Sequence, residues 1–429
     1  MRMLPPALKL PSLRLAAWPP ARATLDPARI GLALLKHVAW LVLGLILLLF
    51  TLLFPILILA ICAVTISLIS FRKSTSIGIA TTVLVTIFLA WVNSGKLNSG
   101  DFSWYANHYE LLSRIPLTNY LGHQVNQFTI KAREPFYYTM AFLLSRLTGA
   151  NVMALNLFIS CWIYGLTGTA YTLMARNLRL SPGHTALFVF TGMMISTTFT
   201  LSTHLVRQEF AGCALLLGVT CLYLQHRKTA LAFLIIAAAS HESAYVPIIA
   251  IVAGTLIVKR FGTFGTSRAG TLVQAVAMVL FAGLGYYYAN HVVTDSPFQP
   301  VRSDGEINTI TYTVDAILFT AAALTIRYSP ANLKTKAIMS VVALYMAFLL
   351  GLSSQPLPLL RMYFYLDLVR GASSAYIAWR LLQTRHGPLW VAPIALTALA
   401  YTELRILSSS FRYYGGGLIS HLLFPSFLV

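Results

Sequence analysis

Long apolar segments separated by short polar connections run through most of this chain. A helix needs about 20 consecutive apolar residues to cross a bilayer, and segments near this length recur from residue 37 onward. Lys and Arg gather in several of the connections, as they do at the cytoplasmic ends of membrane spans. The pattern predicts an all-α, polytopic integral membrane protein.

The basic clusters indicate which connections lie inside the cell. They are Arg72-Lys73, Arg227-Lys228, Lys259-Arg260 with Arg268, and Lys334 with Lys336. A segment between two cytoplasmic clusters must cross the membrane an even number of times. Residues 229–258 lie between two such clusters, so we expect them to cross twice. The arms 229–239 and 244–258 should then meet at an outer turn made of Ser240-His241-Glu242-Ser243.

The same reasoning divides the rest of the chain into about 12–13 transmembrane helices. The other expected spans are a hairpin within 37–71, then 77–93, 152–175, 184–204, 208–226, 271–290, 309–326, 337–353, 362–382 and 388–407. Residues 135–148 have no crossing of their own, and we expect a short re-entrant or interfacial helix there, under an outer loop of residues 94–134.

Three regions are expected on this basis. Residues 1–36, rich in Pro and Arg, should form a cytoplasmic N-terminal tail. Residues 37–410 should form a single multi-span transmembrane domain, and residues 411–429 a C-terminal tail.

Composition agrees with a membrane protein and argues against a nucleic-acid partner. Of the 429 residues, 57% are hydrophobic and 10% charged, with a mean hydropathy of +0.73, too apolar for one water-soluble core. The net charge of +19 comes from Lys and Arg scattered through short connections. Membrane lipids with anionic headgroups are the partner that such scattered charge favours. The sequence predicts no metal and no cofactor.

Several ionisable residues that lipid should exclude are predicted near one surface. They are Asp101, Glu134, Arg207, His241, Glu242 and Arg361. An ionisable side chain at membrane depth is costly and by default marks a functional site. The alternative for each is a charge at the headgroup boundary, where it costs little. For Glu134 it is a charge at the start of a helix, before Pro135.

The outer loop offers a surface suited to a sugar. If residues 101–113 are helical, Asp101, Tyr105 and Tyr109 share one face, because they are spaced at i, i+4 and i+8. Sugars stack on aromatic rings and hydrogen-bond to carboxylates. The alternative is that the tyrosines are interfacial anchors, which are common at bilayer boundaries.

Short motifs around these residues resemble a known family. In order, they are Ser99-Gly100-Asp101 with Tyr105 and Tyr109, Glu134-Pro135 with Tyr138, Arg207-Gln208 with Ala211, His241-Glu242-Ser243-Ala244, and Arg361-Met362-Tyr363-Phe364. Their order and context resemble the EpsG-like branch of the Wzy-type polysaccharide polymerases, over roughly residues 77–370. The chain departs from the pattern at Phe102, where a tyrosine often follows the aspartate, and at Glu242, a position that the motif leaves free.

The resemblance implies a GT-C-like helical architecture and a block-transfer glycosyltransferase. Such an enzyme joins undecaprenyl-diphosphate-linked oligosaccharide repeat units into an exopolysaccharide or O-antigen chain at the periplasmic face of the bacterial inner membrane. It implies that the growing chain moves to the nonreducing sugar of a new unit and that the diphosphate carrier is released. A flippase and chain-length or export proteins would be its partners.

The residue types suit this chemistry. A bidentate guanidinium is well shaped to hold a leaving diphosphate, which makes Arg207 and Arg361 the candidates. His241 is the first choice for general base, with Glu242 and Asp101 as backups. The residues assigned to substrate binding are Tyr105, Tyr109, Glu134, Tyr138, Gln208 and Tyr363.

Other classes of function remain open. An O-antigen ligase or another outer-leaflet glycosyltransferase would use the same chemistry with a different acceptor. A flippase for the same lipid carriers should keep its charges along a central cavity and show two similar halves, whereas the sequence shows no internal repeat. A structural partner of an export complex would not explain His241 beside Glu242 on the same face as Arg207.

Overall fold

A computed structural model describes residues 74–96, 101–116, 119, 134–196, 205–262, 268–293, 309–327 and 333–407. These residues belong to one compact unit, Leu53–Val429. Within the described ranges the chain forms helices and no strand element, which confirms the all-α fold. The predicted tails 1–36 and 411–429 and the hairpin 37–71 lie outside the described residues.

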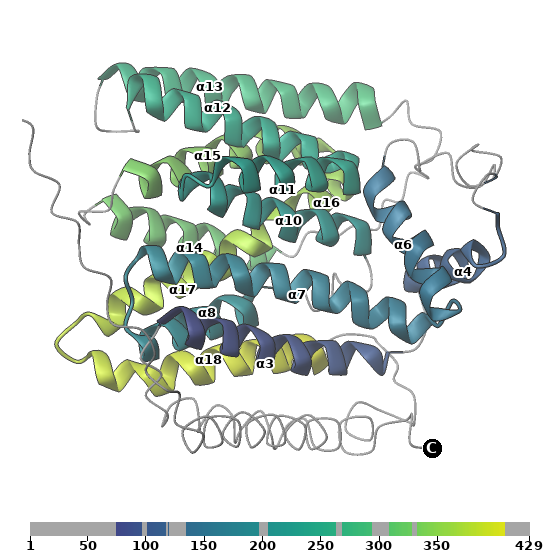
Figure 1. The fold of residues 1–429 in the computed structure, drawn as a ribbon. Coiled ribbons are helices and arrows are strands. Elements are labelled where there is room, and N and C mark those ends of the chain that lie inside the picture. Colours follow the sequence, from purple (N-terminus) through teal and green to yellow (C-terminus); the bar gives the residue numbers. More distant parts are fainter. Residues whose placement is uncertain are drawn as a thin grey trace, which may run out of the picture. The chain divides into compact units, whose positions relative to one another are not determined.

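Figure 1 shows the helices, coloured along the sequence. The α-helices are α3 (Ser74–Ser94), α4 (Asp101–Leu112), α6 (Pro135–Thr148), α7 (Val152–Asn177), α8 (Pro182–Ile195), α10 (Val206–Tyr223), α11 (Arg227–Ser240), α12 (Tyr245–Phe261), α13 (Arg268–Tyr287), α14 (Thr309–Arg327), α15 (Leu333–Gly351), α16 (Pro356–Tyr363), α17 (Tyr365–Leu382) and α18 (Gly387–Leu407). Short helical turns join some of them: η2 (Glu242–Ala244), η3 (Tyr288–Val293) and η4 (Leu352–Ser354).

In the described part of the chain, five helical segments are long and apolar enough to cross a membrane. They are Ser74–Ser94, Val152–Asn177, Glu242–Phe261, Arg268–His291 and Ala337–Ser354. The protein is therefore a polytopic membrane protein. The larger total of about 12–13 crossings stays a prediction.

Three local predictions are confirmed by the helix boundaries. Residues 135–148 form a separate short helix, α6, and residues 101–112 form α4. The predicted break at residues 240–243 is present, because α11 ends at Ser240 and His241 adopts an extended conformation (φ −158°, ψ 130°). One break was not predicted: the expected span 362–382 is divided at Phe364 into the end of α16 and the whole of α17.

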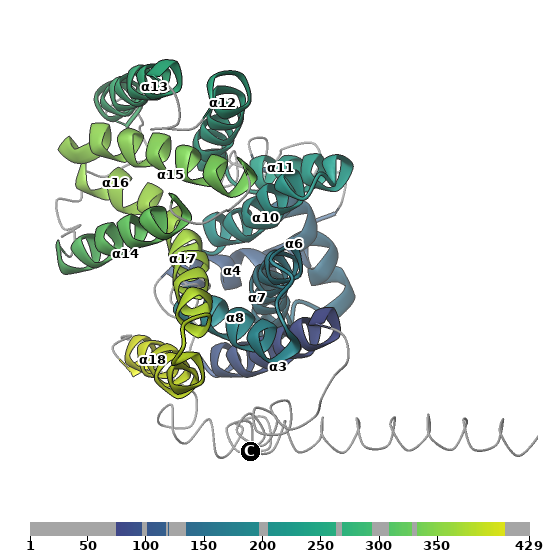
Figure 2. The ribbon, with the colours of Figure 1, turned by 90° about the vertical axis from the view of Figure 1, so that its left-hand side faces the viewer.

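The long helices pack in a connected series (Figures 1 and 2). α3 packs on α7 and α8, α7 packs on α10, and α17 contacts α8, α14 and α18. α11 packs mainly on α10, whereas α12 packs mainly on α15, so the two arms around residues 240–243 have different partners. α4 contacts α6 and α7, and α6 reaches α11. These contacts bring the start of α6 next to the end of α11.

Glycine allows a close helix contact between α13 and α15. A Cβ at Gly285 would clash with the carbonyl oxygen of Phe348, and a Cβ at Gly351 would clash with that of Ala282. Small residues at membrane helix interfaces let the backbones approach closely and gain van der Waals contact. This contact fixes α15, which supports the short helix α16.

Candidate functional site

A buried carboxylate joins three segments that are far apart in the sequence. Glu134, the residue before α6, is 1% exposed and pairs through one oxygen with Arg207 Nη1 and through the other with His241 Nδ1. Arg207 is the second residue of α10, and His241 follows the last residue of α11. The side chains of Arg207 and His241 each remain 21% exposed. The two basic groups therefore form a partly open face over a buried anion.

Local structure explains why Glu134 faces away from its own helix. Its side chain makes no capping hydrogen bond to α6, and the next residue, Pro135, has no N–H at the first helical position. The carboxylate is instead directed to α10 and α11, and the backbone N–H of Glu242 lies 3.4 Å from its Oε1. The alternative interpretation of Glu134, a charge that only starts a helix, does not describe this arrangement.

Two tyrosines surround the guanidinium of Arg207. Its Nη1 donates to the Tyr138 hydroxyl at 3.0 Å, and its Nε points to the Tyr105 hydroxyl at 3.5 Å. The guanidinium carbon lies 5.9 Å from the centre of the Tyr105 ring and 5.6 Å from that of Tyr138, within the range of cation–π attraction. Two predicted substrate-binding tyrosines thus lie beside the predicted diphosphate-binding arginine.

The electrostatics favour an ionised Glu134. Burial alone would raise its pKa, but the hydrogen bond and charge of His241 and the charge of Arg207 outweigh burial and lower the pKa. An ionised carboxylate only accepts hydrogen bonds, so His241 Nδ1 carries the hydrogen and Nε2 is the ring nitrogen left for other chemistry. Burial raises the pKa of Tyr138 to about 12, so its hydroxyl stays protonated near neutral pH.

The Glu134 ion pairs should stabilise the protein in a pH-dependent way. Folding lowers the pKa of Glu134 below its unfolded value, which is near 4.5. The ionised carboxylate therefore stabilises the folded state when the pH is above the unfolded pKa. This stabilisation is lost as the pH falls through the lower pKa of the folded state. We therefore expect wild type to unfold at a higher temperature than Glu134→Gln at about pH 7, and the gap to shrink towards about pH 4. Thermal unfolding of the detergent-solubilised proteins measures this. A gap that widens on acidification would contradict an ionised Glu134.

Arg361 lies on a short helix, α16, that is held at three consecutive residues by three other helices. The Arg361 carbonyl accepts from Gln208 of α10, the Met362 carbonyl accepts from Tyr345 of α15 at 2.7 Å, and the Tyr363 hydroxyl donates to Asp315 of α14. The Arg361 side chain is exposed, and no ion pair with another described residue engages it. The backbone at Arg361 is thus fixed while its guanidinium remains available.

A second buried ionic cluster, on α14 and α17, holds the end of α16. Asp315 (1% exposed) accepts two hydrogen bonds from Arg370 of α17, each 2.5 Å, and Arg370 also pairs with Asp367 at 2.7 Å. Because Asp315 also holds the Tyr363 hydroxyl, the cluster joins α14, α16 and α17. The signal for it lay in the sequence, since these charges fall inside the expected apolar spans 309–326 and 362–382. Sequence reasoning did not use it.

Removing the Asp315 charge should destabilise the protein. In Asp315→Asn, Arg370 keeps Asp367 but loses its bidentate partner, which should cost about 1–3 kcal/mol. We expect a lower unfolding temperature in detergent. Glu110→Gln, on an exposed position of α4, is the matched control and should unfold like wild type. An unchanged temperature for Asp315→Asn would mean that the cluster does not secure these helices.

Three residues assigned to substrate binding hold helices together in this structure. Tyr109 is fully buried, and its hydroxyl hydrogen-bonds Thr148 at the end of α6. Gln208 and Tyr363 are 3% exposed, and their polar groups bond to protein partners on α16 and α14. The expected aromatic face of α4 is therefore divided, because Tyr105 lies beside Arg207 while Tyr109 packs inside.

The two backup bases lie in different settings. Asp101 is the first residue of α4, and its side chain lies outside the described residues. Glu242 is exposed, and both Glu242 and Arg361 are within electrostatic range of the Tyr288 hydroxyl. The backbone N–H of Glu242 belongs to the Glu134 site. Among the described residues, no group of three or more His, Cys, Asp or Glu is placed to hold a metal ion.

Comparison with known proteins gives one match. No curated protein and no solved structure matches this chain. The model of the EpsG family matches residues 79–414, a range that contains Glu134, Arg207, His241 and Arg361. This match covers most of the chain and confirms the resemblance seen in its motifs. The chain therefore belongs to the EpsG family.

Proposed function

We propose that this protein is a polysaccharide polymerase that joins undecaprenyl-diphosphate-linked oligosaccharide repeat units at the periplasmic face of the bacterial inner membrane. Membership of the EpsG family supports a function of the polysaccharide-polymerase type. The observation that carries the proposal is the pairing of one buried carboxylate, Glu134, with both a partly exposed arginine and a partly exposed histidine.

The proposed reaction is a glycosyl transfer with a diphosphate leaving group. The acceptor hydroxyl oxygen attacks the anomeric carbon of the donor sugar, and the bond from that carbon to the diphosphate oxygen breaks. The diphosphate leaves with the bonding electrons, and the hydroxyl proton passes to a general base. We assign this role to His241 Nε2. The pairing of Glu134 with Nδ1 supports the assignment, because it favours the tautomer with an unprotonated Nε2.

The arginines supply the charge that the leaving group needs. Among the described residues, the hydrogen bonds of Arg207 use its Nε and Nη1, which leaves Nη2 for a ligand. Arg361 presents its whole guanidinium from a fixed backbone. Preorganised cations that face developing negative charge lower the barrier, because they need no rearrangement during the reaction.

The sugar surface is proposed at α4. Tyr105 lies over Arg207, and Trp104 is 79% exposed on the same helix. Aromatic rings at these positions suit stacking against pyranose faces. The cytoplasmic N-terminus and the partnership with a flippase and with chain-length or export proteins are part of this proposal, as is the inner-membrane location.

Lipid-linked glycans in cells without this protein test the function. We expect single repeat units on their diphosphate carrier to accumulate on the outer leaflet while polymer is absent, and the wild-type gene to restore polymer. Units trapped on the inner leaflet would indicate a flippase instead. Polymer that is made but not attached to its final acceptor would indicate a ligase.

A further inference from the structure

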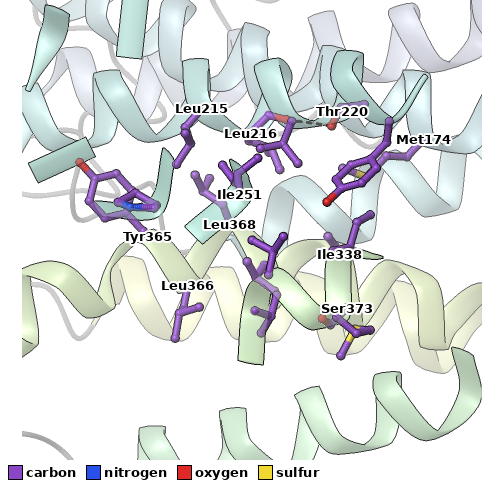
Figure 3. Close-up of a pocket in the computed structure, with 18 of the residues that line it drawn as sticks. Met174, Leu215, Leu216, Thr220, Ile251, Ile338, Tyr365, Leu366, Leu368 and Ser373 are labelled. Atoms are coloured by element: carbon purple, nitrogen blue, oxygen red, sulfur yellow. Dashed lines mark hydrogen bonds between the residues drawn. The ribbon is translucent and has the colours of Figure 1, made fainter. Parts of the chain in front are cut away.

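An apolar cavity lies between α10, α12, α15 and α17 (Figure 3). Side chains such as Leu215, Ile251 and Leu368 form most of its wall. In Figure 3 the labelled polar residues stand towards its ends, with Tyr365 on one side and Thr220 on the other. The middle of the cavity is therefore hydrocarbon, and polar side chains stand at both ends.

The cavity follows α10 and α17 away from the candidate site. Its lining on α10 runs from Gly212 to Tyr223, about 17 Å at 1.5 Å per residue. Gly212 comes five residues after Arg207, and on α17 the lining begins at Tyr365, four residues after Arg361. One end of the cavity thus lies close in sequence to both arginines.

Tyr365 connects the cavity to the site in space. It lines the cavity, and its hydroxyl lies 2.8 Å from the hydroxyl of Ser243, two residues after His241. Tyr365 also lies within electrostatic range of Glu134. The site and the cavity therefore meet at Tyr365, with basic side chains on one side of it and hydrocarbon on the other.

We propose that this cavity binds the polyprenyl chain of the lipid-diphosphate donor, with the diphosphate against Arg207 and Arg361. This inference rests on the proposed function and adds the place of the lipid. The lipid and the cavity are complementary in charge and polarity. The lipid has an anionic head and one long apolar chain, and the cavity is a hydrocarbon-lined space with cations at one end. Holding the chain fixes the depth of the anomeric carbon beside His241, which favours the reactive geometry.

A substitution that fills the cavity should separate long-chain from short-chain ligands. Ala372 lines the cavity seven residues after Tyr365, about 10 Å further along α17. In Ala372→Phe the added ring takes the space of the chain, and crowding of this kind should weaken undecaprenyl diphosphate binding on the order of tenfold. Geranyl diphosphate has the same diphosphate head, but its shorter chain ends before the position of Ala372. The affinity of the protein for geranyl diphosphate should therefore not change.

Native mass spectrometry of the purified full-length protein measures both ligands. Ala275→Phe, on an exposed position of α13, is the matched control and should bind both like wild type. Photocrosslinking needs no variant and covers the case in which Ala372→Phe fails to fold. Undecaprenyl diphosphate with a diazirine in an isoprene unit near the head should label lining residues of α10 and α17 in wild type.

The outcomes distinguish the lipid site from the function. If undecaprenyl diphosphate binds wild type but labels other helices, or binds Ala372→Phe equally well, the cavity proposal is wrong and the proposed function is unaffected. If phosphatidylglycerol displaces the probe equally well, the cavity is a general lipid site and the proposal is wrong. If wild type does not bind undecaprenyl diphosphate at all, both proposals are wrong.

Discussion

Arg207→Ala should abolish polymer while the protein still inserts into the membrane. The substitution removes the guanidinium proposed to hold the leaving diphosphate and leaves His241 as the remaining side-chain partner of Glu134 among the described residues. Arginines that stabilise developing phosphate charge contribute on the order of 10³-fold or more to the rate. We expect a loss of that size in the rate of polymer formation by proteoliposomes supplied with lipid-linked repeat units.

Arg207→Lys tests why an arginine is needed there. A lysine keeps the positive charge but lacks the planar guanidinium, so it cannot hydrogen-bond Glu134, Tyr138 and a diphosphate at the same time. We therefore expect little recovery of activity. Arg361→Lys should also fail. If both lysine variants kept full activity, a positive charge alone would suffice and the proposed guanidinium contacts with the diphosphate would be wrong. Arg227→Ala, at an exposed position at the start of α11, is the control and should polymerise normally.

Glu134→Gln should reduce the polymerisation rate by about 10²- to 10⁴-fold, although both oxygens of the buried Glu134 carboxylate are paired with protein side chains. A glutamine can donate to His241 Nδ1 and so favour the tautomer in which Nε2 carries the hydrogen and is no longer basic. It also removes the charge that holds Arg207. Turnover by purified protein in proteoliposomes, with substrate affinity measured separately, checks this.

The expected pattern for Glu134→Gln is specific to a positioning role. The rate should fall far more than the affinity for the lipid-linked donor, whereas His241→Ala should lose the same activity and Glu242→Gln should be milder. Glu110→Gln, on the exposed side of α4, is the matched control and should turn over like wild type. If Glu134→Gln kept the wild-type rate, His241 would not depend on Glu134, and the assignment of Nε2 as base would lose its structural support.

Much of the helical layout could be predicted from the sequence, because it depends on local properties. Hydropathy marks a span by its length, so residues 152–175 match α7 closely. Charge bias between spans predicted the break at residues 240–243, which α11 and η2 confirm. The break at Phe364 has no such signal, since apolar residues continue on both sides of it.

The site itself was decided by tertiary structure. The sequence determined an all-α membrane protein and the family, and it made Arg207, His241 and Arg361 candidates for the site, because composition and short motifs can be read without knowing which segments pack together. That Glu134 pairs with His241, 107 residues away, depends on the packing of α6 against α11, which no local pattern encodes. The same is true of Tyr109, whose spacing suggested a binding face and whose burial makes it a contact between α4 and α6. Only the folded chain determines which polar groups have hydrogen-bond partners. A polar group that leaves water costs free energy unless it finds such a partner.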